Sequence, residues 1–150
     1  MPVETLSTVT TLASTLAAFI AAFAALKSVS SWKKQARFES KRDAINTWVS
    51  GAVLFRGRLK FIYKSDVKWP EDKAEIELIS EHFWSWNSTW PYAKASLDGE
   101  LEKEAFILWN NVYLSYSSVM EGKANINTLG LAVEAVYNSS IIKSIITKES

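Results

Sequence analysis

The sequence predicts an all-α protein: one N-terminal transmembrane helix that continues into a cytoplasmic, four-helix-bundle-like domain. Three observations lead to this prediction. Residues 5–26 contain no charged side chain, and the residues directly after them are rich in Lys and Arg. Apolar residues then recur at helical spacing along the chain. No stretch alternates with a period of two for long enough to indicate a strand. We therefore expect an anchor in residues 1–30 and a helical domain in residues 31–150.

Residues 5–26 have the length of a membrane-spanning helix. About 20 residues cross a hydrocarbon core of about 30 Å, and this run supplies 22. A signal peptide is an alternative, with Ala22-Phe23-Ala24 as a cleavage site, but residues 1–11 lack the basic residues that such a signal needs. A buried or interfacial helix is another alternative. An interfacial helix should carry Lys or Arg on its polar face, and this run has neither.

Around a helix, this run has one face of small residues and one of bulky residues. Small faces let helix backbones approach closely in lipid, which favours self-association or binding of another span. The alternative is that both faces follow from an Ala- and Thr-rich composition. The predicted packing stripe has a 4-3-4-3-4 spacing and consists of Ser7, Thr11, Ser14, Ala18, Ala21 and Ala25. The bulky stripe consists of Val9, Leu12, Leu16, Phe19, Phe23 and Leu26.

The charges that follow the run predict its orientation. The membrane-proximal basic residues are Lys27, Lys33, Lys34, Arg37, Lys41 and Arg42. The other end has no Lys or Arg, so we expect the N-terminus outside and the domain in the cytoplasm. Residues 27–64 carry a net charge of +8 and residues 65–150 a net charge of −6. Basic residues beside a span favour anionic lipid as a partner, and the acidic remainder argues against nucleic acid.

Helical periods continue beyond the run. The span is expected to enter a long helix, directly or after a short break at residues 28–31, that ends near Lys64. Its expected core face is Phe38, Ile45, Trp48, Ala52, Phe55, Leu59 and Ile62. Pro70 suits the first position of a second helix, with Glu71 and Asp72 in its first turn. The core face expected there is Ile76, Ile79, Phe83, Trp86 and Trp90.

Pro91 should kink or end that second helix, and a short helix is expected over residues 92–97. Asp98-Gly99 predicts a turn. The core face of the next helix is Leu101, Ala105, Leu108, Val112, Ser115 and Val119. Gly122 is its expected C-terminal cap, and Asn127 or Thr128 is the expected N-cap of a last helix. That helix is marked by Leu129, Val133, Val136, Ser140 and Ile145.

The sequence lacks the residues that most catalytic and metal sites need. There is no cysteine, and His82 is the single histidine. Zinc and di-iron sites need several such ligands, and the glycine-rich phosphate-binding motifs are absent. We interpret His82 as a surface or interface histidine. We therefore expect no enzymatic activity, no catalytic residue, no cofactor and no metal.

Seven tryptophans are an unusual number for 150 residues. Trp86 and Trp90 belong to an expected core face, whereas Trp84 lies off it and Trp109 follows Leu108. Large aromatic residues dominate protein interfaces, so Trp84 and Trp109 are the candidate partner surface. The alternative is a broad core that simply uses tryptophan.

The stretch from Leu26 to Trp48, LKSVSSWKKQARFESKRDAINTW, resembles the juxtamembrane region of uncharacterised small bacterial proteins with one N-terminal span and a helical cytoplasmic body. The resemblance rests on Trp32, Lys33, Lys34 and Gln35 after a Ser-rich step. It implies a bacterial inner-membrane location and assigns no functional residue. The expected function is a membrane-anchored interaction protein that binds a protein partner and self-associates, in a setting such as defence, exclusion or immunity. The alternative is a membrane-perturbing effector whose spans assemble into a permeable bundle.

Overall fold

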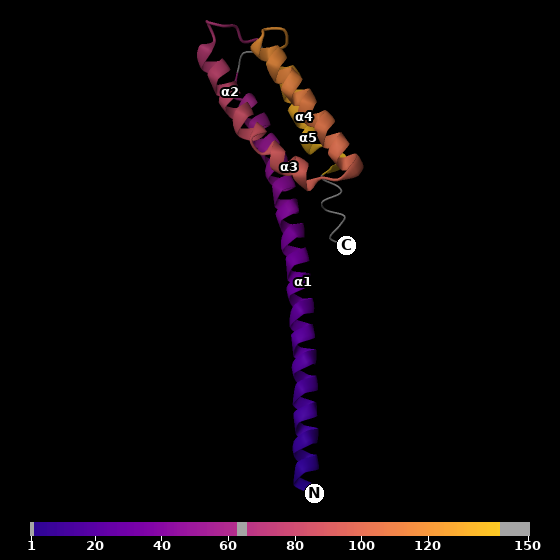
Figure 1. The fold of residues 1–150 in the computed structure, drawn as a ribbon. Coiled ribbons are helices and arrows are strands. Elements are labelled where there is room, and N and C mark those ends of the chain that lie inside the picture. Colours follow the sequence, from indigo (N-terminus) through magenta and orange to yellow (C-terminus); the bar gives the residue numbers. More distant parts are fainter. Residues whose placement is uncertain (1, 63–65, 142–150) are drawn as a thin grey trace. The chain divides into compact units, whose positions relative to one another are not determined.

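The computed structural model describes residues 2–62 and 66–141, with side chains described from Ser14 onward. It confirms the all-α prediction, since the described residues form helices and no strand. The helices are α1 (Pro2–Leu59), α2 (Lys73–Asn87), α3 (Trp90–Ser96), α4 (Gly99–Met120) and α5 (Ile126–Tyr137) (Figure 1). The chain divides into two compact units, Met1–Ser40 and Lys41–Ser150, and α1 contributes to both.

α1 is a continuous helix of 58 residues, without a break at residues 28–31. Neither Gly nor Pro lies there, and the Ser30 hydroxyl donates to the Lys27 carbonyl at 2.8 Å within the helix. The prediction that this helix ends near Lys64 is wrong, because it ends at Leu59. Just after the end of the helix, the backbone hydrogen bonds change to three-residue spacing: the Phe61 amide donates to the Arg58 carbonyl, and the Ile62 amide donates to the Leu59 carbonyl. This early end lets Val67 return to the core, where it is buried.

The predicted start of α2 at Pro70 is also wrong. Residues 70–72 form a turn, and the helix begins at Lys73. Asp72 is buried, and its carboxylate accepts from the Lys68 amide at 3.0 Å while its carbonyl accepts from the Ile76 amide. The Asp72 carboxylate therefore closes the turn that precedes α2, whereas the prediction was that Asp72 lies in the first turn of the helix.

Pro91 begins a helix, where the sequence predicted a kink or an end. α2 ends earlier, at Asn87, and Pro91 lies in the first turn of α3. That position suits proline, because its missing amide hydrogen would have no partner there. Trp90 consequently belongs to α3, although it is buried as expected. The short helix covers Trp90–Ser96, close to the predicted residues 92–97.

Two glycines with positive φ bound α4: Gly99 at 61° and Gly122 at 69°. This left-handed conformation costs glycine little, and Gly122 follows the helix end as predicted. The predicted N-cap of α5 is wrong, since the cap is Asn125, whose side chain accepts from the Thr128 amide at 3.0 Å. The expected continuation of this helix to Ile145 lies outside the described residues.

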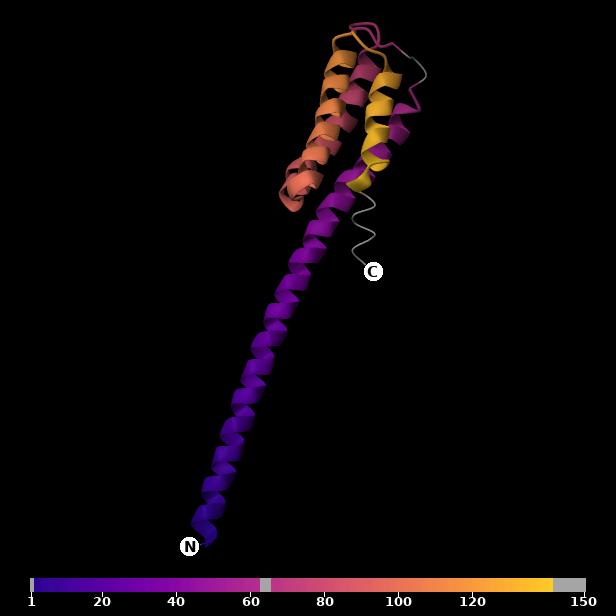
Figure 2. The same cartoon turned by 90° about the vertical axis from the view of Figure 1, so that its right-hand side faces the viewer.

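The unit Lys41–Ser150 is built around one apolar core. α4 and α5 lie side by side (Figure 2), and α1 from Ile45 onward, α2 and α3 complete the core. The core faces predicted from helical spacing are wrong at Phe38 and Ser140, which are exposed, and are confirmed at fifteen buried residues. These are Ile45, Trp48, Ala52, Phe55, Leu59, Ile79, Phe83, Trp86, Trp90, Ala105, Val112, Val119, Leu129, Val133 and Val136.

An aromatic layer joins α1 to its neighbours. The Trp48 ring lies 5.9 Å from that of Trp86 and 5.3 Å from that of Trp90, between ring centroids. The Trp86 indole N–H donates to the Trp48 carbonyl at 3.0 Å. On the far side, Trp90 stacks on Trp109 of α4 at 5.3 Å with nearly parallel planes. Stacked rings and a buried hydrogen bond thus connect three helices to α1.

We expect Trp86→Phe to destabilise the protein by about 2 kcal/mol, because it removes a buried hydrogen bond and part of a packed ring. The matched control is Trp84→Phe, at a ring that is 52% exposed, where a surface substitution should cost at most about 0.5 kcal/mol. Denaturant unfolding of the full chain in detergent, followed by circular dichroism, measures both. Equal losses in the two variants would contradict this account of the layer.

Candidate interaction surfaces

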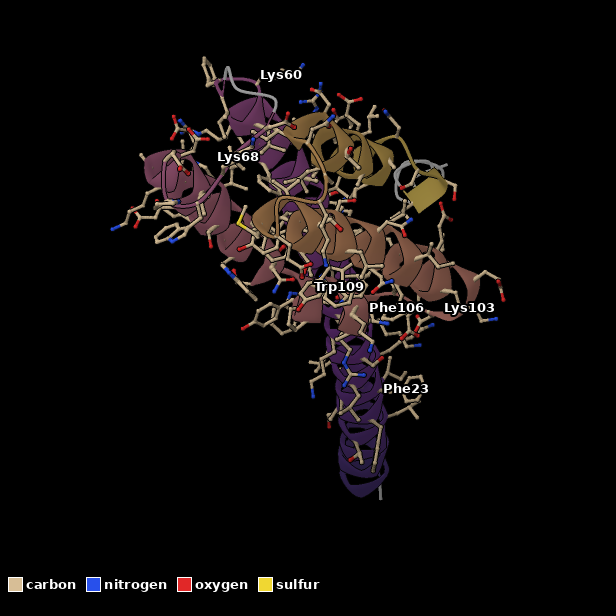
Figure 3. All side chains as sticks on the ribbon, turned by 90° about the horizontal axis from the view of Figure 1, so that it is seen from above. Phe23, Lys60, Lys68, Lys103, Phe106 and Trp109 are labelled. Carbon is tan, nitrogen blue, oxygen red and sulfur yellow. The ribbon has the colours of Figure 1, made fainter. Side chains whose placement is uncertain are left out.

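Within the described residues, α1 is the one helix that is long and apolar enough to cross a membrane, and it lies near the N-terminus. Its apolar window is entirely exposed. Phe23, for example, is 72% exposed and projects from the helix (Figure 3). A soluble helix rarely leaves a contiguous apolar surface of this size in water.

The predicted packing stripe lies on one face of this helix over its described part. Ser14, Ala18, Ala21 and Ala25 are all exposed, and their 4-3-4 spacing keeps them within one narrow strip. The backbone at Ser7 and Thr11 is helical, but their side chains lie outside the described residues. The bulky residues Leu16, Phe19, Phe23 and Leu26 occupy the opposite face.

The six predicted basic residues fall into two groups. Lys27, Lys33, Lys34 and Arg37 belong to the unit Met1–Ser40 and are exposed, and none forms an ion pair with a described residue. Lys41 and Arg42 belong to the helical body. Lys41 pairs with Asp98 at 3.4 Å, and Arg42 is half-buried. The first four are therefore exposed cations without an ion-pair partner among the described residues.

The two predicted partner tryptophans have different surroundings. Trp84 is half-exposed, and its ring meets those of Phe83 and Tyr116 edge-on at 5.1 and 6.3 Å. Trp109 is half-buried, stacks on Trp90, and donates its indole N–H to the Asn87 side-chain oxygen at 2.8 Å. Trp109 thus joins α4 to α2 and α3, and Trp84 presents the larger free surface.

Sequence reasoning missed the outer face of α4. Four large apolar residues are exposed there: Phe106, Ile107, Tyr113 and Leu114. Figure 3 shows Phe106 beside Trp109 on this helix. A signal was present, because residues 105–120 contain no charged side chain, whereas a bundle helix usually carries charges on its outer face.

An open groove of about 770 Å³ runs between α1 and α2 in the body. Its lining includes His82 and Ser85 from α2, and Asp43 and Arg58 from α1. His82 is half-buried and makes no hydrogen bond or ion pair with a described residue. No carboxylate among the described residues forms a hydrogen bond or ion pair with the imidazole.

The residues that the structure describes contain no cluster of three or more His, Cys, Asp or Glu side chains able to hold a metal ion. The chain matches no protein-family model, no curated protein and no solved structure. The candidate functional features of this chain are therefore the apolar helix, the basic residues that follow it and the exposed aromatic surfaces of the body.

Proposed function

We propose that this protein is a membrane-anchored helical interaction protein of a bacterial inner membrane. The exposed apolar segment of α1 anchors it, and the body binds a protein partner in the cytoplasm. The observation that carries the proposal is an apolar helix segment that no described residue covers, followed directly by exposed cations that form no ion pair with a described residue. The setting we favour is defence, exclusion or immunity, with no catalytic step.

The positions of the cations support the orientation. Because α1 is continuous and rises 1.5 Å per residue, Lys27 to Lys34 lie within about 12 Å of Leu26 along the axis. That distance is comparable to the screening length of about 8–10 Å near a surface. These lysines can therefore reach anionic headgroups, with a gain of about 1 kcal/mol each.

Trp84 supports a partner on the body. A half-exposed indole that rests edge-on against the buried Phe83 ring and the partly buried Tyr116 ring is already held in position. A partner that covers it therefore gains apolar area at little cost in conformational entropy. Such residues are frequent hot spots of interfaces.

The proposed topology can be tested with single cysteines, because the natural chain has none. We expect Thr5→Cys to react with a membrane-impermeant maleimide in intact spheroplasts. Ser85→Cys, at an exposed position of the body, should react after the membrane is permeabilised. A cleaved signal peptide would give the opposite pattern: loss of the Thr5 label and labelling of Ser85 in intact spheroplasts.

Self-association through the span can be tested by filling the small stripe. We expect Ala18→Leu with Ala21→Leu to weaken span association about tenfold, since bulky side chains keep backbones apart. The matched control makes the same change at Ala22 and Ala24, to either side of the stripe. Crosslinking of the full chain in vesicles measures both. Unchanged oligomers in the stripe variant would exclude this packing face.

A second candidate function is membrane perturbation, favoured by the hydroxyl-rich first half of the span. Residues 5–15 include seven Ser or Thr, which could line a polar path if several spans assemble. In that case, inducing the full chain should depolarise cells, whereas residues 32–150 alone should not. Equal effects of the two chains, measured with a potential-sensitive dye, would exclude this candidate.

A further inference from the structure

The open groove of about 770 Å³ between α1 and α2 has opposite charges at its two ends. It lies within the unit Lys41–Ser150, so both of its walls belong to the body. On the α1 wall, Asp43 and Arg58 are separated by about 22 Å along the helix axis, at 1.5 Å per residue. That separation exceeds the screening length of about 8–10 Å, so each charge can interact with an occupant independently of the other.

The α2 wall of the groove runs in the opposite direction to the α1 wall. Trp48 of α1 packs on Trp86 of α2. Phe55, two turns later on α1, packs on Phe83, which precedes Trp86. His82, which lines the groove, therefore lies toward its basic end.

Most polar side chains of the groove lining have no partner within the part of the chain that the structure describes. Thr47 and Thr89 donate their hydroxyls to backbone carbonyls at 2.8 and 2.7 Å. The other polar lining side chains make no hydrogen bond or ion pair with a described residue: Asp43, Asn46, Ser50, Arg58, His82 and Ser85. The groove therefore presents donors and acceptors on both walls, between a carboxylate at one end and a guanidinium at the other.

We propose that this groove binds an extended segment of a partner protein, with a basic group near Asp43 and an acidic group near Arg58. An extended chain advances about 3.3 Å per residue, so a segment of about seven residues reaches from one charge to the other. The inference rests on the proposed function, because it names the chemistry by which the body recognises its partner. It adds a site that is separate from the Trp84 surface, since Trp84 is not part of the groove lining.

The lining of the groove fits an extended segment better than a helix. The backbone N–H and C=O groups of an extended segment need hydrogen-bond partners, and the hydroxyl and amide side chains of the two walls can supply them. An amphipathic helix needs a continuous apolar groove for its anchor residues. Among the lining residues, Leu54 is the one large apolar side chain that is exposed, whereas Phe55 and Trp86 are buried.

The two end charges also favour a segment over a small anion. A small anion held by Arg58 and His82 would leave Asp43 without a partner at the far end of the groove. Small-molecule sites also bury most of the surface of their ligand, whereas this groove is open. A partner segment with opposite charges at its ends satisfies both ends at once.

The test measures binding of three peptides of about seven residues, blocked at both ends, to the full chain in detergent micelles at low salt. One peptide has Lys at one end and Glu at the other, one has Lys at both ends, and one has Glu at both ends, with Ala and Ser between. His82 is the single histidine, so isotope-labelled histidine gives one imidazole signal that reports occupancy of the groove. We expect the Lys–Glu peptide to bind up to about fivefold more tightly than the other two, as an exposed ion pair allows.

A charge change at one end of the groove should change which peptide binds best. Arg58→Glu leaves two acidic ends, so the Lys–Lys peptide should become the tightest ligand. Asp43→Lys leaves two basic ends, so the Glu–Glu peptide should become the tightest. The matched control is Lys60→Glu, at an exposed position outside the groove lining (Figure 3). It changes the net charge as Arg58→Glu does, and the Lys–Glu peptide should remain the tightest there.

The absence of a shift with any peptide, or equal affinity for all three, would overturn the proposal. An unchanged order of affinities in Arg58→Glu and Asp43→Lys would also overturn it, once circular dichroism shows that both variants keep their helices. Inorganic phosphate that saturates the His82 signal at concentrations as low as the Lys–Glu peptide does would indicate a small-anion site instead. The cysteine-labelling test of topology is separate: an outward-facing body would contradict the proposed function and leave the three peptide affinities unchanged.

Discussion

The packing of Trp48 is the interaction on which the body depends. This side chain is fully buried, touches Trp86 and Trp90, and its carbonyl receives the Trp86 indole hydrogen. Its own indole N–H finds no partner among the described residues, so packing of the ring, and not a hydrogen bond from the indole, holds this side chain in place. Gly51, one turn along α1, makes the contact possible, since a Cβ there would lie 3.0 Å from the Trp86 ring.

The contact between α1 and α5 also depends on the space left by a glycine, but here the contacting side chains are charged. The Arg56 guanidinium donates to Glu134 at 2.6 Å, and both side chains are largely covered. Gly130 leaves the space, because a Cβ at that position would lie 2.9 Å from the guanidinium carbon. Helical spacing cannot predict such a pair, since its members are 78 residues apart. The buried faces were predictable, because the 3.6-residue period alone determines which residues point inward.

Helix ends were harder to predict, because they depend on contacts that form after folding. α1 ends at Leu59, and Val67 beyond it is buried in the core; α2 begins at Lys73, after Asp72 has closed the turn from Lys68. A helix long and apolar enough to cross a membrane was predictable from composition, since such a span needs only about 20 consecutive apolar residues. The outer face of α4 was not predicted, because a bundle helix is expected to have one apolar face, and Ala105, Val112 and Val119 already form the face of α4 in the core.

The exposed apolar surface on the outer face of α4 is small in energetic terms. Burying one aliphatic side chain contributes about 1.5–3 kcal/mol at most, and Ile107 and Leu114 are the aliphatic residues exposed there. The loss of translational and rotational freedom on association costs about 4–15 kcal/mol. Contacts of these two side chains alone would therefore be largely offset by the cost of association.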